Sequence, residues 1–193
     1  TTLGVLKCMQ QIADRYIILG EVRGDMVDIN EYTKTSLRNL AEFNFEDDNE
    51  YLNVRDYYAV INNCNYALAK MDTTLAHNNE RVMIDEYAAL LGIRAWTYLQ
   101  LAINYGKVPY YTNPITTVAD SEREYPMMDV KELASELLPQ LEPYKDYDLP
   151  VFVQDDKLNK QIFPVLQLVI ADLYLWAGYY SNAAIEYTDY LTT

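Results

Sequence analysis

The sequence has a single histidine, and this scarcity excludes most catalytic arrangements that depend on imidazole. His77 lies between two predicted helices, next to Asn78, and turns commonly collect polar residues of this kind. Any Ser-His-Asp or Cys-His arrangement would have to use this one residue. We therefore interpret His77 as a surface turn residue.

Glycine is also sparse. The six glycines are scattered, and no Gly-x-Gly or Gly-Lys-Ser/Thr motif occurs. Phosphate-binding loops need such motifs because their backbone must approach the ligand closely. The sequence therefore does not indicate an NTPase or a nucleotide-dependent dehydrogenase.

The two cysteines, Cys8 and Cys64, do not have the spacing of a metal site, and two are too few to define a disulfide framework. Cys64 falls on an apolar helix face, which predicts a small buried side chain. A bridge between the two cysteines stays open as an alternative. Lys7 stands where lipid-attachment sites carry a small neutral residue, so we do not interpret Cys8 as lipidated.

Basic residues are few: 15 Lys and Arg face 29 Asp and Glu, which gives a formal net charge of -14. Affinity for nucleic acids depends on clustered Lys and Arg, so we expect no nucleic-acid partner. The longest apolar run, from Val165 to Gly178, is interrupted by Gln167 and Asp172 and is too short to cross a bilayer. The chain opens at Thr1 without a signal peptide, which we interpret as a processed or trimmed start.

The sequence is rich in apolar residues at helical spacing. Steps of three and four residues predict helices over Leu3–Leu19, Val54–Met71 and Glu86–Tyr105, with a short helical piece near Tyr32–Leu40. A polar turn, Asp72–Asn79, joins the second and third of these helices. These two should therefore run antiparallel.

Two residues stop the longest helix. Gly106 can take the left-handed conformation that a helix C-terminus needs, and Pro109 cannot continue a helical ladder. The following residues up to Met128, which include Tyr110 and Tyr111, are therefore predicted to form a loop.

A short helix is predicted after this loop. Asp129 and Glu132 have the spacing of a capping box and predict its start. Pro139 predicts its end near Leu138, because a proline in a helix interior costs about 3 kcal/mol.

The last part of the chain predicts a helical hairpin after an irregular connection, Glu142–Lys160. Its helices are Ile162–Ala177 and Asn182–Leu191, with a turn at Gly178. It carries small and aromatic residues at the spacing of a tetratricopeptide unit: Ala171, Tyr174, Ala183 and Tyr187. We therefore predict an all-α fold of tetratricopeptide-like stacked helical hairpins with long irregular loops, forming a single domain over residues 1–193.

The order Leu-x-x-Arg-Ala-x-x-Tyr-x-x-Leu-x-x-x-Tyr-Gly-x-Val-Pro, from Leu91 to Pro109, resembles the N-terminal half of the SusD/RagB family. Two later segments also resemble it. They are Val130, Leu133, Ala134, Leu137, Leu138 and Pro139 in the short helix, and Ala171, Tyr174, Gly178, Ala183 and Ala184 in the hairpin. The three matches occur in the right order along the chain.

The resemblance implies a surface lipoprotein of the outer membrane of Bacteroidota. Such a SusD-like protein captures an oligosaccharide or another nutrient and caps a TonB-dependent, SusC-like transporter that imports it. The resemblance further implies that residues 1–193 are the N-terminal part of a longer protein, with a signal sequence and a lipidated cysteine upstream. It implies binding without catalysis, so we expect no enzyme activity and no cofactor.

Nineteen tyrosines are more than a core needs, and tyrosine combines a flat apolar face with a hydroxyl, which suits contact with sugar rings. Six fall on helix-packing faces and are predicted to be core residues: Tyr16, Tyr57, Tyr87, Tyr98, Tyr174 and Tyr187. Loop aromatics are better ligand candidates: Phe43, Phe45, Tyr51, Tyr110, Tyr111 and Tyr125. From these we select Phe45, Tyr51, Tyr110 and Tyr111 as the candidate ligand-binding residues.

The acidic runs Glu46–Glu50 and Asp25–Glu31 could offer oxygen ligands to calcium. Neither has the alternating ligand pattern with a central glycine, so we interpret both as solvated loops and expect no metal site. None of the acidic residues stands in a catalytic sequence context. Arg94, beside the apolar stripe of its helix, could hold a carboxylate from an acidic loop and pin that loop to the scaffold.

Two alternative functions stay open. A free-standing helical-repeat adaptor would bind a peptide or protein partner, and polar side chains such as Asn62, Asn63 and Asn65 would have to face its concave groove. A carbohydrate-active enzyme is the second alternative, and turnover of a glycan would identify it.

Overall fold

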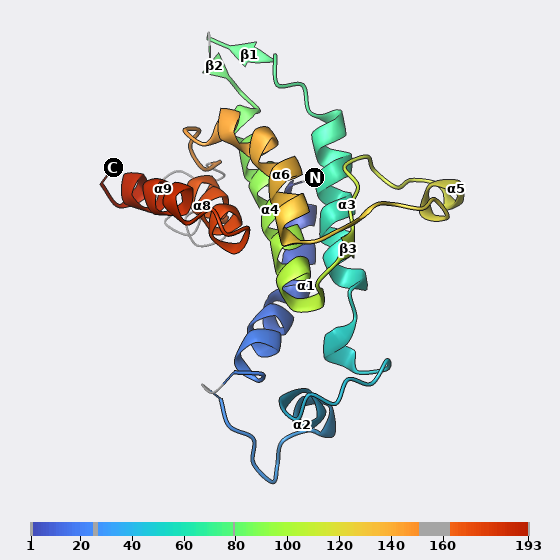
Figure 1. Cartoon of the computed structure of the whole chain (residues 1–193). Helices are drawn as coiled ribbons and strands as arrows, with labels where there is room; N and C mark the ends of the chain where they lie inside the picture. Colours follow the sequence, from blue (N-terminus) through green and yellow to red (C-terminus); the bar gives the residue numbers. More distant parts are fainter. Residues whose placement is uncertain (1, 25–26, 79, 151–162, 193) are drawn as a thin grey trace.

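The computed structural model of the chain describes residues 2–24, 27–78, 80–150 and 163–192 (Figure 1). Its α-helices are α1 (Thr2–Glu21), α2 (Thr35–Ala41), α3 (Arg55–Lys70), α4 (Ile84–Tyr105), α5 (Val118–Ser121), α6 (Val130–Leu141), α8 (Leu166–Trp176) and α9 (Tyr180–Thr192). Two short 3-10 helices are η1 (Glu50–Leu52) and η2 (Glu142–Tyr144). The strands β1 (Ala76–His77), β2 (Glu80–Arg81), β3 (Val108–Pro109) and β4 (Met127–Met128) lie in connections. The predicted all-helical fold is confirmed.

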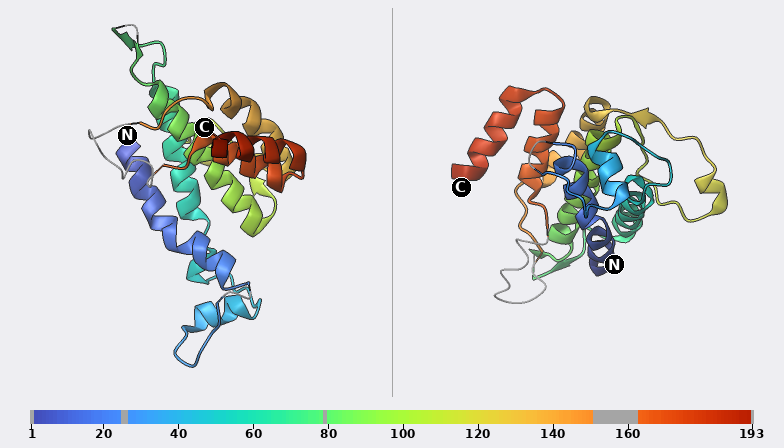
Figure 2. Two further views of the ribbon diagram at one scale, coloured as in Figure 1. Left: turned by 90° about the vertical axis from the view of Figure 1, so that its left-hand side faces the viewer. Right: turned by 90° about the horizontal axis from the view of Figure 1, so that it is seen from below.

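Helix α4 is the centre of the fold. Helices α1, α3, α6 and α8 all pack against it, and α9 packs on α8. Figure 1 and the right-hand view of Figure 2 place α3 on one side of α4 and the α8–α9 hairpin on the other. The sequence of α4 is apolar on nearly every face, as expected for a helix that is covered all round. In the described part of the chain, no helix combines the length and the apolar character that crossing a membrane requires.

The predicted packing stripe of α3 faces α4 and α1. Tyr57, Ile61 and Cys64 are fully buried. Cys64 and Cys8 are both free thiols, so the open alternative of a bridge between them is not realised. Among the tyrosines predicted to be core residues, Tyr57 and Tyr98 are fully buried. The other four are half-buried: Tyr16, Tyr87, Tyr174 and Tyr187.

Glycines end two helices as predicted. Gly106 has φ 79°, and its N–H donates to the carbonyl of Ala102 at the end of α4. Gly178 has φ 86° in the turn between α8 and α9. Both conformations are readily accessible to glycine because it has no Cβ atom.

Helix α6 begins where the capping box predicts and ends later than Pro139 predicts. Asp129 accepts from the N–H of Glu132, and Glu132 accepts from the N–H of Asp129. The helix continues through Pro139 to Leu141, so the predicted end near Leu138 is wrong. Pro139 lies in the last turn, where it removes only one internal hydrogen bond, and burial of Leu141 against the core offsets that loss.

Helix α8 begins at Leu166, not at Ile162. Residues 151–162, which include much of the predicted connection Glu142–Lys160, lie outside the described residues. The later start has a local reason: Pro164 disfavours helical backbone at Phe163, and Val165 is the extended residue before the helix.

Three segments extend from the helical body. The α2 segment and the β1–β2 hairpin lie at opposite ends of the molecule, which is clearest in the left-hand view of Figure 2. The third extension is the loop between α4 and α6, which carries α5 and projects to the side (Figure 1, yellow). This loop holds two of the selected candidate residues, Tyr110 and Tyr111.

Candidate functional site

The loop between α4 and α6 is closed at its base by a short antiparallel ladder. β3 pairs with β4 through Val108 opposite Met128 and Pro109 opposite Met127. One residue further, the N–H of Tyr110 donates to a carbonyl of the returning limb over 2.9 Å. The ladder fixes where the loop leaves the helical body.

Asparagine side chains of α3 hold the outgoing limb of the loop. Asn62 Nδ2 donates to the carbonyl of Ile115 over 2.9 Å, and the N–H of Ile115 donates back to Asn62 Oδ1 over 2.7 Å. Asn65 Nδ2 donates to the carbonyl of Tyr111 over 3.2 Å. Asn63 Nδ2 donates to the Ala59 carbonyl of its own helix over 2.8 Å and to Cys8 Sγ of α1 over 3.7 Å. The adaptor alternative requires these asparagines to face a peptide groove, and Asn62 and Asn65 do not meet this requirement because both are hydrogen-bonded to the loop.

Tyr98, on the central helix, holds Tyr111 through one hydroxyl. Its Oη donates to the Tyr111 carbonyl over 2.7 Å and accepts from the Tyr111 N–H over 3.0 Å. Tyr98 is fully buried, and this burial raises the pKa of its hydroxyl far above the ordinary value. The hydroxyl therefore stays protonated and keeps both hydrogen bonds at physiological pH.

Tyrosine rings continue the contact from the helices into the loop. Tyr58 of α3 stacks on Tyr111 with ring centroids 5.9 Å apart, and Tyr111 meets Tyr125 of the returning limb at 4.8 Å. Tyr98 packs on Tyr110 at 5.1 Å. Burial, with a smaller contribution from Tyr125, raises the pKa of Tyr111 to about 12. These rings join the two limbs of the loop and fix it on the scaffold.

Arg94 is buried beneath this loop, and its partners differ from those predicted. Its Nη1 donates to Asn65 Oδ1 over 2.9 Å, and its Nη2 donates to Gln140 Oε1 of α6 over 2.7 Å. Gln140 Nε2 in turn donates to the hydroxyl of Tyr110 over 3.0 Å. The predicted carboxylate partner is therefore wrong, although Arg94 does connect the loop to the scaffold. Two amides replace the carboxylate because α3 and α6, and not an acidic loop, lie beside Arg94.

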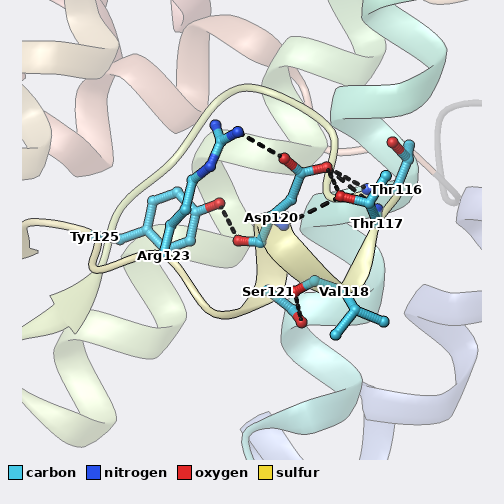
Figure 3. A network of polar contacts seen from close by, with 7 residues as sticks. All are labelled: Thr116, Thr117, Val118, Asp120, Ser121, Arg123 and Tyr125. Carbon is cyan, nitrogen blue, oxygen red and sulfur yellow. Dashed lines mark hydrogen bonds and ion pairs between the residues drawn. The ribbon is translucent and has the colours of Figure 1, made fainter.

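The tip of the loop is organised around Asp120 of α5 (Figure 3). Its carboxylate accepts from the Thr117 hydroxyl over 2.7 Å and pairs with Arg123 over 3.1 Å. The Tyr125 hydroxyl donates to the Asp120 carbonyl over 2.8 Å. The Thr117 hydroxyl is the main cause that lowers the pKa of Asp120, with smaller contributions from backbone N–H groups and Arg123. Asp120 is therefore a structural carboxylate that ties the tip together.

Between tip and base the loop encloses a hollow of about 250 Å³, which we call the loop hollow. Its lining consists of Tyr110, Tyr111, Thr112, Asn113, Pro114, Asp120, Arg123 and Tyr125. Aromatic surface, an amide and a guanidinium thus lie next to one another. Because the Asp120 carboxylate is engaged with Thr117 and Arg123, the exposed groups left for a ligand include Asn113 and the outer face of Arg123.

The structure brings two of the four selected residues together. Tyr110 and Tyr111 line the loop hollow, although Tyr110 is only 8% exposed and belongs largely to the core. Phe45 and Tyr51 lie in the segment between α2 and α3, away from the loop hollow (Figure 1). Phe45 is exposed beside Phe43, with ring centroids 6.2 Å apart, and Tyr51 is half-buried in η1.

Several residues of the site were missed at the sequence level. Thr117 and Asp120 form a capping box whose Thr-x-x-Asp pattern is readable in the sequence. Asn62 and Asn65 are three apart on one helix face, the spacing at which two side chains can serve one partner surface. Tyr98 was predicted only as a core residue.

The acidic run Glu46–Glu50 folds back on α2. Glu46 accepts from Asn39, and Glu50 accepts from Ser36 and pairs loosely with Lys34. Part of the run Asp25–Glu31 lies outside the described residues. Across residues 2–24, 27–78, 80–150 and 163–192, no group of three or more His, Cys, Asp or Glu side chains is placed to hold a metal ion.

Comparison with known proteins identifies the family to which this architecture belongs. Residues 7–142 match the SusD-like family described as "Starch-binding associating with outer membrane". The fold is similar to that of surface glycan-binding protein A from Bacteroides uniformis, with a TM-score of 0.69 and 19% sequence identity. That similarity covers 100% of this chain and 46% of the other, so this chain spans about half of that protein's length. No curated protein sequence matches the chain significantly. Because the family match covers well over half of its residues, the chain belongs to the SusD-like family.

Proposed function

We propose that the chain binds a glycan at the loop hollow and acts without chemical conversion of that glycan. The observation that carries the proposal is the contact of Tyr111 and Tyr125 at 4.8 Å beside Asn113 and Arg123, in a chain of the SusD-like family. Tyrosine faces suit the apolar side of a sugar ring, and amide and guanidinium groups suit its hydroxyls.

The size of the loop hollow limits what it can hold. Pockets for drug-sized ligands have volumes of roughly 300–1,000 Å³, and this one has about 250 Å³. We therefore propose that it takes one sugar unit of a longer chain. Neighbouring units would extend along the exposed loop surface. The selected residues Phe45 and Tyr51 lie elsewhere, and their part in binding stays a prediction.

The lowered pKa of Asp120 and the contacts of its carboxylate support binding over catalysis. A general acid in glycoside hydrolysis needs a raised pKa, whereas hydrogen bonding from Thr117 lowers the pKa of Asp120. This carboxylate is also occupied by contacts that hold the loop. We therefore propose that the site binds the glycan and leaves it intact.

We further propose that residues 1–193 are the N-terminal helical domain of a longer surface lipoprotein, which delivers its glycan to a TonB-dependent transporter in the outer membrane. The family description supports the membrane association. The outer surface of the α8–α9 hairpin supports a larger protein, because Trp176, Tyr180 and Leu191 are 54%, 69% and 81% exposed. Large apolar side chains left exposed on one hairpin fit a surface that contacts further protein.

Affinity electrophoresis tests glycan binding. The protein is run through gels that contain soluble starch or another polysaccharide, and retardation measures binding. Tyr125→Ala should weaken affinity by about tenfold, or ~1.4 kcal/mol, through loss of ring contact. Tyr125→Phe should bind nearly as well as the wild type because it keeps the ring.

Tyr66→Ala is the matched control, since Tyr66 is an exposed tyrosine of α3 outside the loop hollow. A wild-type protein that no glycan retards, or equal weakening by Tyr66→Ala and Tyr125→Ala, would contradict the proposal. Release of shorter sugars by the purified protein would contradict the non-catalytic part. Purification of the native protein from outer membranes, with mass measurement, tests its length and its association with a transporter.

A further inference from the structure

Arg94 is a buried cation whose hydrogen-bond partners are neutral. The residue is 4% exposed, and both of its bonded nitrogens donate to amide oxygens, those of Asn65 and Gln140. Its Nε has no hydrogen-bond partner among the described residues. A buried charge is unfavourable unless it is paired or well solvated by dipoles. Two amides that turn their oxygens toward the guanidinium supply such dipoles.

A guanidinium donates hydrogen bonds and accepts none. Each amide that contacts Arg94 must therefore present its oxygen to it, which turns the amide nitrogen the opposite way. The nitrogen of Asn65 then points at the carbonyl of Tyr111, at 3.2 Å. The nitrogen of Gln140 donates to the hydroxyl of Tyr110 over 3.0 Å and also to the Glu136 carbonyl of its own helix over 2.6 Å. Both connections end on consecutive residues that line the loop hollow.

We infer that Arg94 is a positioning residue for the loop hollow: it orients the Asn65 and Gln140 amides so that they hold Tyr111 and Tyr110 in place. The relevance to glycan binding rests on the proposed function, whereas the effect on the loop does not. Arg94 itself does not line the loop hollow.

The two anchors of the loop respond differently to Arg94. Without the guanidinium, the Asn65 amide can turn over and place its oxygen against the Tyr111 carbonyl, where two acceptors repel each other. The second anchor, Asn62 on Ile115, has no hydrogen bond to Arg94 and uses both the oxygen and the nitrogen of the single side-chain amide of Asn62. Loss of Arg94 should therefore loosen the loop at Tyr111 and leave it fixed at Ile115.

Amide hydrogen exchange at these two positions tests the inference without any ligand. The Tyr111 N–H donates to Tyr98 Oη and not to Asn65, so its exchange rate reports how firmly the whole residue is held. Arg94→Met should raise this rate by about tenfold, because losing the Asn65 bond to the Tyr111 carbonyl leaves Tyr98 as its remaining hydrogen-bond partner there. The Ile115 N–H should keep its wild-type rate. Arg94→Lys retains the charge, but a single ammonium nitrogen cannot match the fork of two donors, so an intermediate rate is expected at Tyr111.

The Asn65→Asp variant distinguishes the effect of the side-chain orientation at residue 65 from the effect of leaving the Arg94 charge unpaired. The new carboxylate gives Arg94 a charged partner but faces the Tyr111 carbonyl with a second acceptor, so exchange at Tyr111 should rise although the buried charge is now paired. Ile93→Val is the matched control, because Ile93 is a fully buried neighbour on α4 without a side-chain hydrogen bond. In the Ile93→Val variant, the exchange rates of the Tyr111 and Ile115 N–H groups should change by the same factor.

An unchanged rate at Tyr111 in Arg94→Met, or equal increases at Tyr111 and Ile115, would overturn the inference. Retardation by starch should fall in Arg94→Met and Asn65→Asp in proportion to the loosening at Tyr111. Undiminished glycan binding by a variant with a loosened loop would overturn the role in binding. If the wild type binds no glycan, the proposed function fails, and the exchange rates still decide whether Arg94 positions the loop.

Discussion

Asn62 and Ile115 exchange two hydrogen bonds, one in each direction, across 53 positions of sequence. The asparagine side chain carries a carbonyl and an N–H group, so it pairs with the Ile115 backbone as a neighbouring strand would. The backbone N–H and carbonyl of Ile115 thereby both have hydrogen-bond partners, although Ile115 does not belong to a sheet. This pair and the Tyr111 contacts hold the outgoing limb against α3 and α4.

Replacement of Asn62 should therefore destabilise the protein more than replacement of its neighbour. Asn62→Ala leaves both backbone groups of Ile115 without their partner, and we expect the free energy of unfolding to fall by about 1–3 kcal/mol. Asn63→Ala is the control. Asn63 is exposed and bonds mainly within its own helix, so its replacement should change stability by less than ~0.5 kcal/mol. Urea unfolding measures both values, and equal losses would contradict the assignment.

The loop tip should depend on pH through Asp120. Its folded-state pKa lies below the ordinary value of 3.8, chiefly because of the Thr117 hydroxyl. The stabilising contribution of the carboxylate is therefore complete above the unfolded value and is lost as pH falls through the folded value. We expect the Thr117 amide signal in NMR spectra to shift as the tip opens between about pH 5 and pH 2.

Asp120→Asn should remove this pH dependence at Thr117, because the amide does not titrate in that range. The turn at Asp72 provides an internal reference, since a hydrogen bond from Thr74 lowers the pKa of Asp72 in the same direction. That turn should continue to titrate in the Asp120→Asn variant. Persistence of the Thr117 transition in this variant would assign it to another group.

Phe43 has an unfavourable backbone conformation that glycine would relieve. It follows α2 with φ 57°, and hydrogen bonds from Phe43 to Leu40 and from Asn44 to Asn39 close a Schellman motif. The left-handed conformation costs a non-glycine residue ~1–2 kcal/mol. Phe43 is 62% exposed, so its side chain buries little apolar surface. Phe43→Gly should therefore raise the free energy of unfolding by about 0.5–1 kcal/mol.

Phe45→Gly is the opposite case. Phe45 is a similarly exposed aromatic without positive φ, so glycine there should lower stability by about 0.5–1 kcal/mol through added freedom of the unfolded chain. Thermal unfolding of the two variants should move the melting temperature in opposite directions. A decrease for both would mean that the Phe43 ring contributes more contact energy than its exposure indicates.

Pro139 should be replaceable with a gain in stability. It has no N–H to donate to the carbonyl of Ser135, and it is exposed in the last turn of α6. Pro139→Ala restores that donor and should raise the free energy of unfolding by about 1–2 kcal/mol, after allowance for the more flexible unfolded chain. Pro143→Ala should not help, because Pro143 lies in the first turn of η2, where proline is favoured. Equal stabilisation by both would contradict this account.

The helices were predictable because their packing is periodic. Tyr57, Ile61 and Cys64 recur at the spacing of one helix face, and this face is buried whatever the detailed geometry. Gly106 and the Asp129–Glu132 capping box are local signals that act within one turn. Pro139 misled the prediction because the burial of Leu141, a tertiary effect, outweighs a local preference.

The site was less predictable because its contacts are not local. No pattern within a short window relates Asn62 to Ile115 or Arg94 to Gln140. The sequence located Arg94 beside a packing stripe and led us to expect a carboxylate partner, whereas the actual amide partners depend on which helices lie beside it. Tyr110 and Tyr111 were selected as loop aromatics. Their unequal burial depends on how they pack against Tyr98 of α4, which is a contact between segments that no local pattern indicates.

The double anchoring of the loop has a consequence for how proteins of this type can diversify. Its base is held by helix residues, whereas the stretch from Thr116 to Glu124 is mostly solvent-exposed. The hydrogen bonds of Asp120 and its ion pair with Arg123 stay within the loop, so we expect substitutions in that stretch to leave the packing of the helices and the stability of the scaffold unchanged. Under the proposed function, ligand preference could then change independently of the scaffold.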